Sequence, residues 1–206
     1  AHSAISDATR FPIRWVVAGP GLWPKLLMEP PDAASFPRPP EPALRAYGIR
    51  IARDGTWFHD GSPIRRIALA KLFSTALERD EAGAFWLITP VERGRIEVED
   101  APFVAVAMMI EGAGKDQRLV FRTNLDDTVI AGPDHPIRVA YRPLSDEPAP
   151  YLVVRERLEA RISRAVFYDM VEHAVERPTA RGTEIGIWSE RTFFPLGTIA
   201  PDGRLG

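Results

Sequence analysis

The chain has 206 residues, of which 45% are hydrophobic and 26% charged, the proportions of an ordinary globular protein. Its 26 basic and 28 acidic side chains give a formal net charge of −2, so no overall positive field attracts nucleic acid or acidic lipid. The absence of cysteine excludes disulfides, a thiolate nucleophile and cysteine-ligated zinc, and a reducing, cytoplasmic location is expected.

Prolines are concentrated at the start of the chain, where nine of the twenty lie before residue 43. Because proline lacks a backbone donor, residues 1–45 are expected to form an extended arm. The arm carries Trp15 and Trp23, which could pack on the body or on a partner. Its apolar stretch, residues 11–28, is interrupted by charged residues, glycines and prolines, so neither a signal-peptide core nor a membrane span is expected.

A β-hairpin and a helix are predicted next. Ile49 and Ile51 alternate with arginines, residues 53–56 are typical of a tight turn, and Trp57 begins a returning strand. Ser62 followed by proline predicts the N-cap and first position of an amphipathic helix that ends near residues 79–83.

Six short apolar runs between residues 84 and 141 predict a β-meander, and a proline-rich stretch at 143–150 predicts a linker. The hairpin and helix pattern then returns, with Ser163 as the N-cap of the second helix. This repetition predicts a duplication. We therefore expect an α+β protein with mostly antiparallel sheets, made of two related hairpin-helix-strand subdomains at residues 46–142 and 143–206.

A charged strand at residues 92–102 is the first candidate for a functional surface. Alternation places Arg95, Glu97 and Glu99 on one face. This face is either an ordinary solvated side of an antiparallel strand or the polar wall of a cleft, with Arg95 binding an anion.

Two turns add further candidates. Asn124 and Asp127 lie in one, and Asp134 and His135 lie in the other, between two prolines. These residues could only shape their turns, or they could supply amide, carboxylate and imidazole groups for recognition or acid–base chemistry. His59 lies in a third mixed cluster, where the predicted helix N-terminus would favour an anion.

Several motifs that would identify a catalytic or binding site are absent from the sequence. Residues 112–116 lack the first glycine and the final serine or threonine of a phosphate-binding loop, and are expected to form a hairpin turn. No nucleophile elbow occurs, and no two histidines have metal-ligand spacing. No metal or cofactor is therefore expected.

Three stretches resemble a bacterial family known only as domain of unknown function 1285 (DUF1285): RDGTWFHDGSPI at 53–64, TPVE through EDAPFV at 89–104, and FRTN through GPDHP at 121–136. With weaker likeness beyond them, the resemblance covers about residues 48–197. It implies two subdomains with structural repetition, a C-terminal half superficially like a pleckstrin-homology fold, a role in signal transduction, and a ligand site between the halves for a molecule such as a nucleotide. The motif residues near such a cleft would be Trp57, His59, Arg95, Glu99, Asp100, Asn124, Asp127 and His135.

The leading hypothesis is a non-enzymatic, ligand-binding regulatory protein, since charged strand ends occur without a recognisable nucleophile, metal set or cofactor motif. A second hypothesis is a small hydrolase or transferase with His135 as base and Asp127 or Asp134 orienting it. A third is a scaffold whose proline-rich arm binds a partner.

Overall fold

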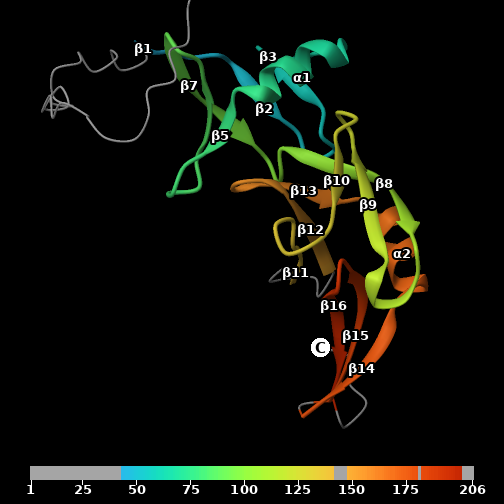
Figure 1. Ribbon diagram of the computed structural model, residues 1–206. Helices are drawn as coiled ribbons and strands as arrows, with labels where there is room; N and C mark the ends of the chain where they lie inside the picture. The colour runs from blue at the N-terminus through green and yellow to red at the C-terminus, as the bar shows by residue number, and fades with distance from the viewer. Residues whose placement is uncertain (1–42, 142–147, 181, 201–206) are drawn as a thin grey trace, which may run out of the picture. The chain divides into compact units, whose positions relative to one another are not determined.

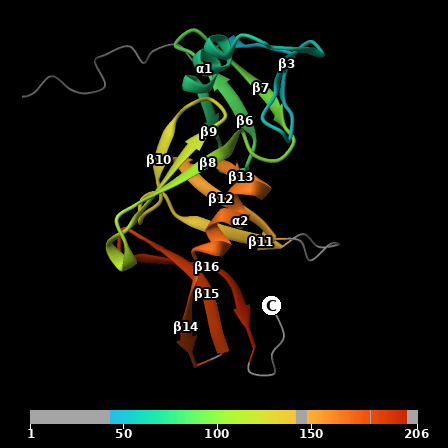
Figure 2. The same cartoon turned by 90° about the vertical axis from the view of Figure 1, so that its right-hand side faces the viewer.

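The computed structural model describes residues 43–141, 148–180 and 182–200. In these residues it contains two α-helices and a much larger proportion of strand, which confirms the α+β class (Figures 1 and 2). No described helix has both the length and the apolar character needed to cross a membrane. Most of the expected arm, and the scaffold hypothesis with it, lies outside the described residues.

The first sheet is built from residues 43–98. Its elements are β1 (Ala43–Leu44), β2 (Ile49–Ile51), β3 (Trp57–His59), β4 (Ser62–Pro63), α1 (Ile67–Thr75), β5 (Leu77–Arg79), β6 (Phe85–Ile88) and β7 (Glu92–Val98). The strand order is β4-β3-β2-β7-β6-β5, and β1, which was expected to belong to the arm, pairs with β7. Strands β2 and β7 are parallel, so the chain between them crosses over through α1.

The second sheet is built from residues 103–162. Its strands are β8 (Phe103–Glu111), β9 (Arg118–Thr123), β10 (Thr128–Ile130), β11 (Ile137–Tyr141), β12 (Pro148–Arg155) and β13 (Leu158–Ile162). Their order is β10-β9-β8-β13-β12-β11, with only β8 and β13 parallel. The expected turn after β8 contains a short 3₁₀ helix, Gly114–Asp116.

The remaining described residues form a helix and a third sheet. These elements are α2 (Arg164–Glu172), β14 (Val175–Thr179), β15 (Gly182–Ser189) and β16 (Thr192–Ile199). Ser189 joins this sheet to the second one, because its buried hydroxyl donates to the Ala131 carbonyl at 2.6 Å and accepts from the Leu119 amide at 2.9 Å.

The predicted repetition is confirmed. Hairpin β2–β3 precedes α1 and hairpin β12–β13 precedes α2, and each hairpin contributes a strand to a parallel pair. The two hairpins turn through residues with positive φ, Gly55 at 84° and Glu156 at 45°. The likeness to a pleckstrin-homology fold stays a prediction.

The two helix starts differ from each other. Ser163 caps α2 as predicted, with its hydroxyl accepting from the Val166 amide at 3.4 Å. The prediction for Ser62 is wrong: it lies in β4, and α1 begins after Arg66 without a side-chain cap. The cause is the left-handed turn at Asp60 and Gly61, which folds the chain back so that Ser62 pairs with His59.

The predicted end of α1 is also wrong. The helix stops at Thr75 instead of near residues 79–83, because Leu77–Arg79 forms strand β5 against β6. Pairing with a neighbouring strand overrides the helical pattern in this segment.

The boundary expected between residues 142 and 143 falls between β11 and β12, which are neighbours in one sheet. The prolines that suggested a linker include Pro148 and Pro150, and both lie within β12. The change from the first sheet to the second comes instead between Val98 and Phe103.

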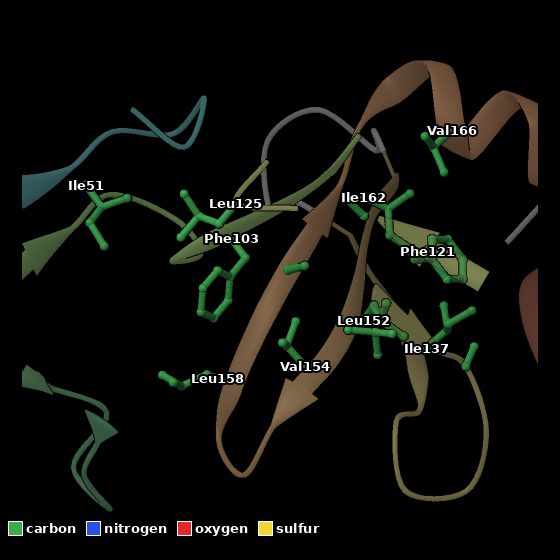
Figure 3. Packing of buried hydrophobic residues seen from close by; sticks show 14 of the residues in the cluster. Ile51, Phe103, Phe121, Leu125, Ile137, Leu152, Val154, Leu158, Ile162 and Val166 are labelled. Carbon is green, nitrogen blue, oxygen red and sulfur yellow. The ribbon is translucent and has the colours of Figure 1, made fainter. Parts of the chain in front are cut away.

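One buried hydrophobic cluster is shared by all three sheets and both helices. Figure 3 shows Ile51 of the first sheet, Phe103 and Leu152 of the second and Val166 of α2, and Trp57 belongs to the same cluster. Burial of this apolar surface is the main stabilising term for the fold.

Candidate functional site

Two of the predicted site residues have structural roles. Trp57 is buried, with its ring stacked on Phe73 at a centroid distance of 6.3 Å. Asn124 joins the two sheets, because its side-chain oxygen accepts from the Val104 amide at 2.9 Å and its amide nitrogen donates to the Gly55 carbonyl at 3.0 Å.

The charged face of β7 is exposed as expected. Arg95 and Glu97 point away from the buried Ile96. Glu99 follows the strand, pairs with Arg50 and accepts from the Arg53 amide at 3.0 Å. Arg95 and Glu97 therefore lie on a solvated strand face, and Glu99 connects the end of this strand to Arg50 and Arg53. Arg95 lines none of the described cavities.

His59 and Asp127 lie at turns. The exposed His59 is 3.6 Å from Asp60, beside the turn into β4 and away from any helix start. The Asp127 amide donates to the Thr123 hydroxyl at 3.1 Å, which closes the β9–β10 turn.

His135 lines a separate cavity of about 330 Å³, together with Asp134 and Glu190. Its Nδ1 is 3.1 Å from the Val153 carbonyl. A backbone oxygen therefore orients the ring, whereas the sequence suggested that Asp127 or Asp134 would do so. Arg95, Asn124 and His135 thus have different surroundings, and no described contact joins them.

Asp100 is the predicted residue around which a polar site forms. Tyr151 donates to its Oδ1 at 2.6 Å, and its Oδ2 lies 3.3 Å from Arg53 Nε and 3.7 Å from Arg161 Nε. Burial, then the hydrogen bond and charge of Asp100, raise the pKa of Tyr151 to about 12. The phenol is therefore held as a neutral donor over the whole physiological pH range.

The sheet register explains why this site forms. Arg138 of β11 is opposite Tyr151 of β12, which is opposite Arg161 of β13, so the three side chains form one row across the sheet. Arg138 stacks over Tyr151 with its guanidinium carbon 4.3 Å from the ring centre.

Glu159 extends the row by two residues along β13. It accepts two hydrogen bonds from Arg138, at 2.6 and 2.7 Å, and these bonds raise the pKa of Arg138. Arg79 of β5 approaches from the first sheet, with its Nη1 4.0 Å from Glu159 and its Nε donating to the Gly83 carbonyl at 3.4 Å. Its guanidinium also faces the Phe85 ring at 5.2 Å.

Two adjoining cavities of about 90 and 310 Å³ lie here and share Arg79 and Glu159. We call them together the domain cleft. The first sheet contributes Arg79 and Phe85, the segment after β7 contributes Asp100, and the second sheet contributes Arg138, Tyr151 and Glu159. Their size reaches the lower part of the range for small-molecule sites, roughly 300–1,000 Å³.

Further ion pairs and a hydrogen bond join residues 43–98 to residues 103–162. Arg157 pairs with Glu81 at 3.0 Å, and Arg155 donates to the Ser74 carbonyl. Lys71 of α1 pairs with Asp126 at 3.0 Å. Within residues 43–141, 148–180 and 182–200, no group of three or more histidine, aspartate and glutamate side chains is arranged to hold a metal ion.

Sequence reasoning identified Asp100 but missed Arg79, Arg138, Tyr151 and Glu159. The signal that could have found Glu159 is the alternation in β13, where Glu159 and Arg161 occupy the positions between buried residues. Arg79 could not be found in this way, because the apolar pattern placed it at a helix end.

Comparison with known proteins gives the family. The model described as the N-terminal domain of DUF1285 matches residues 39–101, and the one described as its C-terminal domain matches residues 102–196. The domain cleft is therefore lined from both matched regions. No curated protein matches the chain.

Two solved structures are similar. A DUF1285 family protein from Silicibacter pomeroyi DSS-3 is 45% identical, with a TM-score of 0.70, over 77% of this chain and 84% of that one. A DUF1285 family protein from Shewanella baltica OS155 is 26% identical, with a TM-score of 0.48, over 61% of this chain and 91% of that one. The two family models match most of the chain, and the protein from Silicibacter pomeroyi DSS-3 is 45% identical to it. The chain therefore belongs to the DUF1285 family.

Proposed function

We propose that the chain is a non-enzymatic regulatory protein that binds a small anionic, nucleotide-like molecule in the domain cleft. The observation that carries this proposal is that both family-matched regions line the cleft. A ligand that contacts both regions would hold them in one arrangement, which is how binding could serve signal transduction. The cysteine-free composition fits a cytoplasmic setting.

We place the anion at Arg79, although four acidic and three basic side chains line the domain cleft. Its main carboxylates already have close partners: Asp100 accepts from Tyr151, Glu159 from Arg138, and Glu81 pairs with Arg157. Arg79 instead makes its polar contacts at 3.4 and 4.0 Å, longer than the roughly 2.7–2.9 Å of a good charge-assisted hydrogen bond. Its guanidinium therefore has donors to offer a phosphate or carboxylate.

The rest of the cleft suits a ligand with a ring and hydroxyl groups. Phe85 supplies aromatic surface next to Arg79, and the carboxylates of Glu159 and Asp100 can accept from hydroxyls or amines. A nucleotide combines all three features.

The test is a melting assay of the whole chain against nucleoside mono- and diphosphates, with nucleosides and inorganic phosphate as partial ligands. A ligand that binds only the native state at a hundredfold excess over Kd adds about 2.7 kcal/mol to the free energy of unfolding. Arg79→Gln should raise Kd roughly 10- to 100-fold through loss of one charge-assisted contact.

Arg177→Gln is the matched control. Arg177 also pairs with a glutamate and stacks on a phenylalanine, and its side chain is 43% exposed against 37% for Arg79. It lies in β14, outside the cleft lining. If no nucleotide shifts the melt at millimolar concentration, or if both variants weaken binding equally, the cleft proposal is wrong.

The His135 cavity favours a second candidate, a small hydrolase or transferase. Donation of the Nδ1 hydrogen to Val153 would leave Nε2 as an acceptor, the form that a general base needs. Turnover of a panel of ester and phosphoester substrates that is lost in His135→Gln but kept in Arg79→Gln would favour this candidate over the first.

A further inference from the structure

Exposed apolar side chains are concentrated on the two helices (Figure 1). In the described part of the chain eleven large hydrophobic side chains are exposed, and six of them lie on α1, on α2 or directly after α2. They are Ile67, Leu69, Leu72, Tyr168, Val171 and Val175. Single exposed apolar residues need no explanation, but two groups of three in such short segments indicate surfaces that a partner covers.

The group on α1 is accompanied by basic side chains. Ile67 is 48% exposed and Leu72 63%. Arg65 and Arg66 precede the helix and are exposed, and no ion pair within the described residues involves either of them. The helix itself contains no acidic residue. We call Arg65, Arg66, Ile67, Leu69 and Leu72 the α1 face, which is apolar and positively charged.

The group on α2 is accompanied by acidic side chains. Tyr168, Val171 and Val175 follow one another at intervals of three and four residues, so they continue along one side of the helix. Glu172 and Glu176 are exposed beside them and also have no ion pair among the described residues. We call these five residues the α2 face, which is apolar and negatively charged.

Both sets of charges lie at helix ends that disfavour them. Arg65 and Arg66 are at the positive end of α1, and Glu172 is at the negative end of α2. Arg164, the basic residue of α2, lies at the opposite end of that helix. Contact between the two faces would therefore offset an unfavourable charge at each helix end, in addition to burying apolar surface.

We propose that the α1 face of one copy of this chain packs against the α2 face of a second copy. Leu69 and Leu72 would pack on Val171 and Val175, with the arginines beside the glutamates. A second copy is the occupant because the chain itself presents the face of complementary shape class and opposite charge. Contact between unlike faces is either made twice in a two-fold dimer or repeated in a longer assembly. None of these residues lines the domain cleft, so the proposal does not depend on the nucleotide site.

Sedimentation equilibrium of the whole chain from about 1 μM to 1 mM measures the association. Two charge-reversed variants test the pairing: Arg65→Glu with Arg66→Glu, and Glu172→Arg with Glu176→Arg. Each variant alone should associate at least about tenfold more weakly, because like charges would meet. Their equimolar mixture should recover the association, because the acidic α1 face of one variant meets the basic α2 face of the other.

The recovery also excludes misfolding as the cause of the loss. Both variants place charges where the helix macrodipole favours them, so each monomer should unfold at a temperature no lower than the wild type. Arg191→Glu is the control for charge, since Arg191 is 82% exposed and lies outside both faces. It should leave Kd unchanged.

Leu72→Ser tests the apolar part of the contact and should raise Kd about tenfold or more. Met109→Ser is its matched control. Met109 is also 63% exposed but lies in β8, outside both faces, so this change should leave Kd unaltered.

Three results would each overturn the proposal. They are a wild type that stays monomeric up to about 1 mM, a mixture of the charge-reversed variants that associates no better than either alone, and equal effects of Leu72→Ser and Met109→Ser. A monomeric wild type that sediments with vesicles of anionic phospholipid, and no longer does so in Arg65→Glu with Arg66→Glu, would instead assign the α1 face to a lipid surface.

Discussion

Tyr151 donates a hydrogen bond to Asp100 at 2.6 Å across the join between the two family-matched regions. This contact forms between the β12 strand and the segment that leads into β8, so it depends on the relative position of the two sheets. Asp100 is 14% exposed and also faces two arginines. The tyrosine therefore helps to stabilise both the join and the wall of the domain cleft.

Replacing Tyr151 by phenylalanine should remove this hydrogen bond while keeping the ring under Arg138. We expect the free energy of unfolding to fall by about 1–2 kcal/mol, because a bond to a charged acceptor is lost. Chemical denaturation measures the change. Tyr141→Phe, at a half-exposed position on the neighbouring strand, is the control and should change stability by less than about 0.5 kcal/mol.

Burial of Tyr151, together with its hydrogen bond to Asp100, predicts a pH dependence of stability. The pKa of Tyr151 is raised from 10.0 to about 12 in the folded protein, so folding favours the protonated phenol. The resulting stabilisation is fully present below pH 10.0 and is lost as the pH rises through about 12. The difference in unfolding free energy between the wild type and Tyr151→Phe should therefore shrink over this interval. A phenolate absorbance at Tyr151 that titrates near pH 10 would contradict the prediction.

Asp100→Asn tests the ionic part of the same cluster. The amide keeps a carbonyl oxygen that can accept from Tyr151, but it leaves Arg53 and Arg161 without their carboxylate. We expect a loss of roughly 1.5–3 kcal/mol in unfolding free energy, since the Asp100 carboxylate is only 14% exposed. Asp116→Asn is the control, because Asp116 pairs with Arg191 at 2.6 Å yet is 72% exposed. It should cost less than about 1 kcal/mol, and equal losses at both positions would show that burial does not decide the effect.

The two predicted N-caps can be compared directly. Ser163→Ala should destabilise the protein by about 1 kcal/mol, because it removes the acceptor for the Val166 amide at the start of α2. Ser62→Ala should change stability by less than about 0.5 kcal/mol, because Ser62 is exposed in β4 and caps no helix. Thermal or urea denaturation of both variants is sufficient, and a larger loss at Ser62 would support the helix start predicted from the sequence.

These serines also show which features can be predicted from sequence. The hairpin turn at residues 53–56 and the Ser163 cap depend on neighbouring residues, and both were predicted correctly. The start of α1 depends on the pairing of β4 with β3, which a local pattern does not contain. The domain cleft is a stronger case of the same kind, because Arg138, Tyr151 and Arg161 become neighbours only through the order and register of β11, β12 and β13.

Asn124 provides the last prediction, since the sequence suggested a binding role and the structure gives it a structural one. Asn124→Ala should leave the Val104 amide and the Gly55 carbonyl without their side-chain partners, and should cost roughly 1–3 kcal/mol. Gln117→Ala, which removes a single side-chain bond to the Trp188 carbonyl, is the control and should cost less. Asn124→Asp should also destabilise, because a carboxylate cannot donate to Gly55. In each variant, any nucleotide that binds the wild type should bind the folded protein with unchanged Kd. If the variants kept their stability but lost nucleotide binding, Asn124 would be a ligand-binding residue, as the sequence suggested. The two hydrogen bonds of Asn124 would then contribute little to the stability of the fold.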